Sequence, residues 1–125
     1  MNQLTEVKNL SPALKKTLKE AQKFIKSRHS LSTRIAYESD IKEFNLWCKN
    51  HKLQSFPASV ESVVLFLSWL AEKGLKPSSI SRRVSALKYS HSEAGLPSPT
   101  DMEPVKATMA GIKRTKGSAP KQVAP

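Results

Sequence analysis

Apolar residues recur at intervals of three and four along most of the chain, which is the spacing that gathers side chains on one face of an α-helix. This pattern predicts helices at about 12–28, 33–50, 60–73, 79–94 and 103–114. No stretch alternates apolar and polar residues as a half-buried strand does, and no segment repeats. The sequence therefore predicts an all-α fold, a compact bundle of four to five helices.

Turn and capping residues separate these segments. Three serines stand where a side-chain oxygen caps a helix start, namely Ser11, Ser59 and Ser78. Thr100–Glu103 has the spacing of a capping box, in which the first and fourth residues satisfy each other's backbone amides. Gly74 and Gly95 follow the last apolar residues of two helices, where glycine commonly ends a helix.

The helix predicted at 60–73 has the most apolar surface. Its stripe runs from Val60 to Ala71, while Phe66 and Trp69 lie off the centre of that stripe. A helix with large apolar side chains on more than one side must be covered on more than one side. We therefore expect this helix to be central to the bundle.

The charge of the chain changes what the helices are expected to do. The 125 residues carry a formal net charge of +11 and have an isoelectric point near 10.0, so a polyanionic partner is indicated. Residues 31–73 hold five basic and five acidic residues, but residues 75–92 hold four basic residues and no acid. Residues 105–125 likewise hold five basic residues and no acid. The positive charge is thus concentrated in two segments.

Several classes of protein are excluded by composition. The single cysteine, Cys48, cannot form an internal disulfide, and the three histidines are not spaced as ligands of a structural zinc ion. The first residues lack the apolar core of a signal peptide, and the longest apolar run, 63–67, is too short to cross a bilayer. We expect no metal, no cofactor, no membrane association and a cytoplasmic location.

The helix at 79–94 is the best candidate for a DNA-facing element. With Ile80 in the core, a rotation of about 100° per residue places Arg82 and Tyr89 on the opposite side, flanked by Ser78 and Ser85. An exposed arginine near a helix start can form a fork of hydrogen bonds to guanine in the major groove.

Phosphate contacts are expected beside that arginine. Serine hydroxyls and the amides of a helix start bind phosphates, and Arg83 is placed to reach one. The alternative is that both arginines only solvate an exposed helix face.

Four blocks occur in order and with matching gaps: S-x-x-T-x-x-A-Y-x-x-D-I-x-x-F-x-x-W-C, P-A-S-x-E-x-V-x-x-F-L-x-x-L-A-E-x-G-L, S-S-I-S-R-R-V-S-A-L and H-x-E-A-G-L-P-S-P-T. Together they resemble the core-binding (SAM-like) domain of tyrosine recombinases, the family of phage integrases and Cre-like proteins. The resemblance runs from about Ser30 to Lys116. It implies a helical domain that grips duplex DNA in the major groove and lies in the nucleoid.

The resemblance also implies roles for particular segments. The helices at 33–50 and 79–94 would cross near a right angle against DNA, and the first and last helices would contact other protomers on DNA. Residues 1–11 would be a disordered terminus, 12–116 the domain, and 117–125 a linker toward the catalytic domain of the same parent chain. The candidate DNA-binding residues are Thr33, Arg34, Lys76, Ser78, Ser79, Arg82, Arg83 and Lys88.

Catalysis is not expected from this chain. Recombinases of this family use two arginines, a lysine, a histidine and a nucleophilic tyrosine from their second domain, and that set cannot be assembled here. Tyr37 and Tyr89 are therefore expected to pack, and His91 to be a core or capping residue. Cys48 is expected to be a small buried hydrophobe. A helical protein-interaction adaptor, with its charge serving solubility, remains the alternative function.

Overall fold

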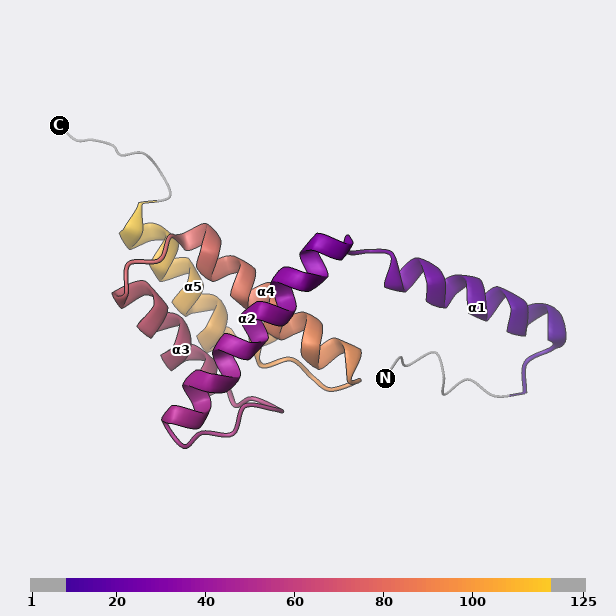
Figure 1. Ribbon diagram of the computed structural model, residues 1–125, viewed down its shortest axis with the longest axis horizontal. Helices are drawn as coiled ribbons and strands as arrows, with labels where there is room; N and C mark the ends of the chain where they lie inside the picture. The colour runs from indigo at the N-terminus through magenta and orange to yellow at the C-terminus, as the bar shows by residue number, and fades with distance from the viewer. Residues whose placement is uncertain (1–8, 118–125) are drawn as a thin grey trace.

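The computed structural model describes residues 9–117 and confirms the all-α fold (Figure 1). Its elements are α1 (Pro12–Lys26), α2 (Leu31–Asn50), α3 (Val60–Glu72), α4 (Pro77–Glu93), the short 3-10 helix η2 (Pro99–Asp101) and α5 (Glu103–Lys116). Each predicted helix is present, with ends within two residues of those expected. The terminus predicted at 1–11 and the linker predicted at 117–125 lie largely outside the described residues, so the division into domains stays a prediction.

Two of the predicted helix caps are wrong. The amide of Ser62 donates to the Ser59 side chain at 3.0 Å, as expected for an N-cap, but α4 begins at Pro77, one residue before the expected cap. Proline suits the first turn of a helix because its ring fixes φ and its missing N–H would have no partner there. Ser78 therefore lies inside the first turn of α4.

The capping box predicted at Thr100–Glu103 does not form. Thr100 is buried in η2, where its hydroxyl lies 2.6 Å from the hydroxyl of Ser98, and Ser98 also accepts from the Thr100 amide. The Thr100 side chain is thus engaged upstream of α5. The N-cap of α5 is Met102, which makes no side-chain cap.

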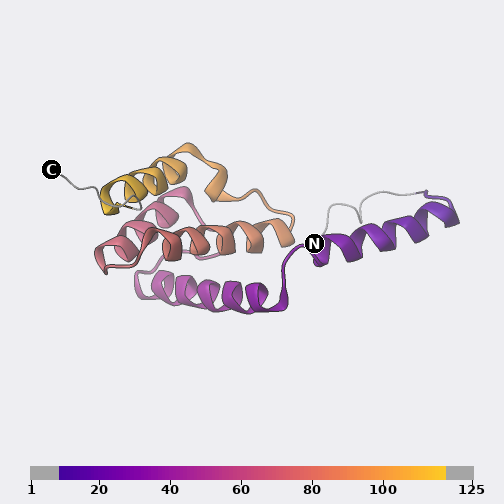
Figure 2. The same cartoon turned by 90° about the horizontal axis from the view of Figure 1, so that it is seen from above.

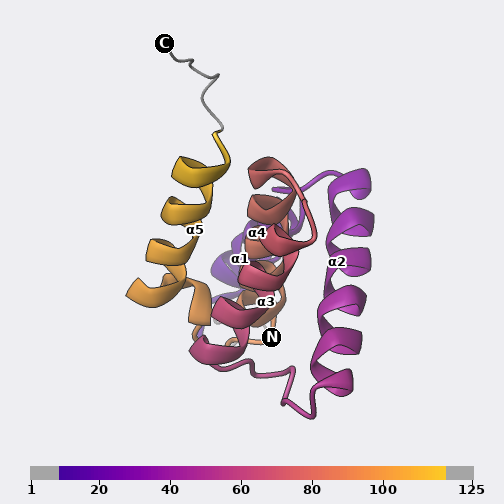
Figure 3. The ribbon, with the colours of Figure 1, turned by 90° about the vertical axis from the view of Figure 1, so that its left-hand side faces the viewer.

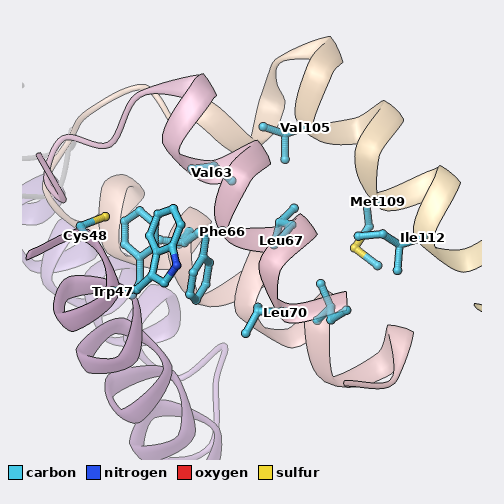
Figure 4. Packing of buried hydrophobic residues seen from close by; sticks show 12 residues of the cluster. Trp47, Cys48, Val63, Phe66, Leu67, Leu70, Val105, Met109 and Ile112 are labelled. Carbon is cyan, nitrogen blue, oxygen red and sulfur yellow. The ribbon is translucent and has the colours of Figure 1, made fainter. Parts of the chain in front are cut away.

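The hydrophobic core surrounds α3, as predicted. Figure 4 shows Phe66, Leu67 and Leu70 of α3 between Trp47 of α2 on one side and α5 on the other. Complete burial of one such side chain stabilises a fold by about 1.5–3 kcal/mol. The buried apolar residues of this core are Phe44, Trp47, Cys48, Val63, Phe66, Leu67, Leu70, Ile80, Leu87, Val105, Met109 and Ile112.

Helix α1 stands apart from this core. In Figures 1 and 2 it extends away from the bundle formed by the other four helices. None of the residues Pro12–Lys26, all of which the structure describes, is buried. Its apolar stripe is left open, since Phe24 is 72% exposed and Leu14 is 53% exposed.

Helices α2 and α4 pack against one another and cross (Figure 1). Figures 1 and 2 show that the two helices begin at opposite ends of the bundle, α2 next to α1 and α4 at the far end. Helices α3 and α5 end on the side where α4 begins (Figures 1 and 3). The fold thus brings two helix ends to the start of α4, which is the positive end of a helix dipole, whereas the segment before α2 lies beside the end of α4, where Arg28 pairs with Glu93 at 2.9 Å.

Candidate nucleic-acid interface

Basic residues accumulate where α4 begins and α3 and α5 end (Figure 1). Lys76 is the N-cap of α4, and Lys73 is the C-cap of α3. The last turn of α5 adds three further cations, Lys113, Arg114 and Lys116. We call this set, together with the first turn of α4, the basic edge. Its charges and its helix start favour an anion.

The first turn of α4 offers free backbone amides. No side chain caps this helix, and the first amide with a helical partner is that of Ile80, which donates to the carbonyl oxygen of Lys76 at 3.1 Å. The amides of Ser78 and Ser79 precede it and have no partner within the helix. The Ser78 side chain is exposed. Amides and hydroxyls so placed can bind a phosphate oxygen.

Arg82 lies one turn further along α4 and is joined to α2. Its Nε donates to Oδ2 of Asp40 and its Nη2 donates to Oδ1, both at 2.8 Å. The Asp40 side chain is 3% exposed, whereas the Arg82 side chain is 48% exposed. The hydrogen bond to Asp40 raises the pKa of Arg82, which stays charged. Arg82 is exposed, as predicted from the sequence, but it is also held in a fixed orientation.

Arg83 has a different environment. Its Nε donates to Oε1 of Glu43 at 2.8 Å, and its Nη1 donates to the carbonyl oxygen of Ser79 at 3.0 Å. Nη1 also lies 3.9 Å from the Asp40 carboxylate. The Arg83 side chain is only 15% exposed. Arg83 therefore joins α4 to α2 and has little surface left for a ligand.

The candidate residues on α2 lie in its first turn. Ser30 caps this helix, accepting from the Thr33 amide at 3.1 Å, and its hydroxyl donates to Oγ1 of Thr33 at 2.9 Å. Arg34 is partly buried, and its Nε has no hydrogen-bond partner among the described residues. The structure places these residues beside the second half of α4, where the His29 and Tyr89 rings lie 5.4 Å apart, and at the opposite end of the bundle from the start of α4 (Figure 1).

Lys88 lies on the side of the bundle where α2 begins. It is in the second half of α4, where it lines a surface pocket together with Arg28 and His29, and its Nζ is 3.3 Å from Oδ1 of Asp101. Both side chains of this pair are mostly exposed, so the pair is weak.

The remaining ionisable candidates are packed into the fold. The Tyr37 and Tyr89 rings lie 5.5 Å apart, and each contacts His29. His91 is fully buried, in agreement with its predicted place in the core. Cys48 is buried too, and burial raises the pKa of its thiol. Among the described residues no cluster of three or more His, Cys, Asp or Glu side chains is arranged to hold a metal ion.

Comparison with known proteins gives the family. Residues 18–94 match the phage integrase N-terminal SAM-like domain. The chain belongs to this family. It is 34% identical over 105 residues to an integrase/recombinase xerD homolog of Selenomonas ruminantium, an alignment that covers 82% of this chain and 30% of the relative. It is 33% identical over 57 residues to the tyrosine recombinase XerD of Pseudomonas putida, covering 46% of this chain and 19% of the relative.

The matched part of the chain thus spans less than a third of the length of these relatives. This family is the one that the four sequence blocks resemble, so the structure and the comparison agree on fold and family. No described helix is both long enough and apolar enough to span a membrane.

Sequence reasoning overlooked two acids of the SAM-like domain. Asp40 and Glu43 both turn toward α4 and bind its two arginines. Their spacing of three residues on one helix was the available signal, because residues three apart share a helix face. Because the charges of 75–92 and those of 31–73 were counted as two separate segments, the two arginines were not paired with these acids.

Proposed function

We propose that the SAM-like domain grips duplex DNA in the major groove with α2 and α4, as the N-terminal part of a tyrosine recombinase. The observation that carries this proposal is the basic edge, where the start of α4 lies close to a half-exposed arginine and a set of lysines. Helix starts and lysines suit phosphates, and a fork of arginine donors suits a base edge.

Each candidate residue takes one kind of contact in this proposal. Arg82 reads a base, because it is exposed and held by Asp40. Backbone phosphates are bound by Lys76, by the first turn of α4 and by the first turn of α2, which supply Ser78, Ser79, Thr33 and Arg34. Arg83 acts mainly by supporting α4. Lys88 contributes at the margin of the surface, since Asp101 already offsets part of its charge.

The chemistry belongs to another part of the parent protein. The described residues hold no nucleophile with a base and an orienting group beside it, because the tyrosines pack and His91 is buried. The printed names of the two relatives are those of recombinases. We infer that the SAM-like domain positions DNA for a catalytic domain of the same chain, which cuts and rejoins the strands.

Salt dependence of binding tests the proposal. A fluorescent DNA duplex is titrated with the chain by anisotropy over a series of salt concentrations. Affinity is expected to fall steeply with salt, with a log–log slope of about −0.9 for each phosphate neutralised. Lys76→Ala should weaken binding to all duplexes and lower the slope by about one, whereas Lys88→Ala should have the smaller effect. A chain that does not bind duplex DNA at low salt refutes the proposed function.

A protein contact through α1 is the second candidate, favoured by the exposure of its apolar stripe. Leu14 and Phe24 lie on this stripe and are more than half exposed. We propose that α1, together with α5, contacts other protomers on DNA. Sedimentation with and without a duplex carrying two sites tests this, with Phe24→Asp expected to abolish association while single-site binding persists. An apolar docking surface should respond little to salt, which separates it from phosphate binding.

A further inference from the structure

We propose that Asp40 determines the sequence specificity of this domain by holding the Arg82 guanidinium in the orientation that reads a base. This inference rests on the proposed function, because it needs α4 to face DNA. Asp40 acts through Arg82 and is therefore a positioning residue. It is nearly buried, so DNA itself does not reach it.

The hydrogen bonds of the pair show how the orientation is fixed. Arginine has five N–H donors in one plane, and two of them, on Nε and Nη2, are directed at the two oxygens of Asp40. Two parallel bonds of 2.8 Å define the plane of the guanidinium as well as its position. Three donors are left, both on Nη1 and the second on Nη2. With the side chain 48% exposed, they are open to a ligand.

Arg83 provides an internal comparison. It is the next residue of α4, but its Nε and Nη1 are both engaged within the fold and its side chain is only 15% exposed. The same residue type is thus placed in two ways by two acids of α2. Glu43 holds Arg83 mostly buried, whereas Asp40 leaves half of Arg82 at the surface.

Because of the negative charge of Asp40, Arg82 should contribute more to sequence specificity than to the overall affinity for DNA. Its carboxylate offsets the positive charge of Arg82, which reduces the attraction of this arginine to any phosphate. The directional donors remain, and they match the two acceptors on the major-groove edge of guanine. A neutralised but oriented arginine therefore adds little to binding of any duplex and more to the choice between duplexes.

A pair of isosteric substitutions tests this. Asp40→Asn and Glu43→Gln each remove one negative charge from the same face of α2, but only the first touches the Arg82 fork. A preferred duplex is first selected with the wild-type chain from short duplexes with a randomised centre. Discrimination is then the ratio of the dissociation constants for a scrambled duplex and the selected one, measured well below the unfolding midpoint of each variant.

Both variants should bind the scrambled duplex somewhat more tightly, and to a similar extent. Discrimination should fall about three- to tenfold in Asp40→Asn, the effect expected for releasing one immobilised side chain. Discrimination should change less than twofold in Glu43→Gln, because Glu43 makes no hydrogen bond to Arg82. Changes below about twofold are usual for mutations at sites that do not interact. Arg82→Lys keeps the charge without the fork and should lose at least as much discrimination as Asp40→Asn.

The outcomes separate this inference from the proposed function. Absence of duplex binding in the wild type refutes both. Binding without sequence preference, or equal discrimination in Asp40→Asn and Glu43→Gln, leaves the DNA grip standing and overturns the role of Asp40. If Asp40→Asn does not fold, Asp40→Glu replaces it: this change keeps the charge but displaces the fork, so discrimination should fall while affinity for the scrambled duplex stays constant.

Discussion

His91 offers the most direct test of what holds α4 in place. The side chain is fully buried, and its ring contacts the Phe56 ring at 4.7 Å between centroids. Nε2 accepts a hydrogen bond from the Ala58 amide at 3.0 Å, and Nδ1 lies 2.8 Å from the carbonyl oxygen of Leu87. An acceptor at Nε2 places the proton on Nδ1, so the neutral ring links the turn before α3 to α4.

Replacing His91 with Phe keeps an aromatic ring but removes both polar atoms. The Leu87 carbonyl retains the helical bond expected from the residue-91 amide, so its loss is small. The Ala58 amide loses its acceptor, and a partly buried donor without a partner costs about 1–3 kcal/mol. We expect a loss near the middle of that range, about 2 kcal/mol, and hence a fall in the unfolding midpoint of roughly 10 °C for a domain of this size.

Thermal and urea unfolding, followed by far-ultraviolet circular dichroism, measure this loss. His51→Phe is the matched control, because His51 is exposed and its ring contacts Trp47 at 4.8 Å, a contact that phenylalanine can keep. That control should change stability by less than about 0.5 kcal/mol. If His91→Phe is no less stable than His51→Phe, the link between Ala58 and α4 does not support the fold and the reasoning is wrong.

Three further predictions use the same unfolding assay. Gly111→Ala should stabilise the domain by about 0.5–1 kcal/mol, because Gly111 lies within α5 and an added Cβ would enter open space. Gly74→Ala should destabilise the domain, because Gly74 has φ +97°. The opposite order of stabilities would contradict the described backbone. Ser59→Ala should cost about 1 kcal/mol, while Ser11→Ala should alter helix content without moving the main transition, since α1 lies outside the core. Phe24→Asp should leave the midpoint unchanged, and a clear loss would show that α1 packs on the bundle.

Helix positions were predictable from the sequence because the core imposes them locally. The stripe from Val60 to Ala71 and the off-stripe Phe66 led to a central α3, which the buried core confirms. Helix starts were less predictable, because several residues near a start can cap it. At α4, a proline in the first turn shifted the start ahead of Ser78, which no periodicity indicates.

The position of α1 did not follow from its pattern. Leu14, Leu18 and Phe24 have the spacing of a core-facing stripe, but Phe24 is 72% exposed. An amphipathic stripe reports that a helix needs a partner surface and does not say which molecule supplies it. The family resemblance implies contacts between protomers for this helix, which is the second contact proposed above.

The interface could be predicted only in part, because a sequence gives the order of the charged residues along the chain but not their distances in the fold. Residues 75–92 contain no acid, yet Arg82 and Arg83 of this segment face Asp40 and Glu43 across the crossing of α2 and α4. Two positive and two negative charges cancel there. The excess charge that attracts DNA in the proposed complex is therefore supplied by other cations, among them Lys76 at the start of α4 and those in the last turn of α5. In the proposed complex, affinity and sequence preference thus belong to different residues, so variants that lose one should largely keep the other.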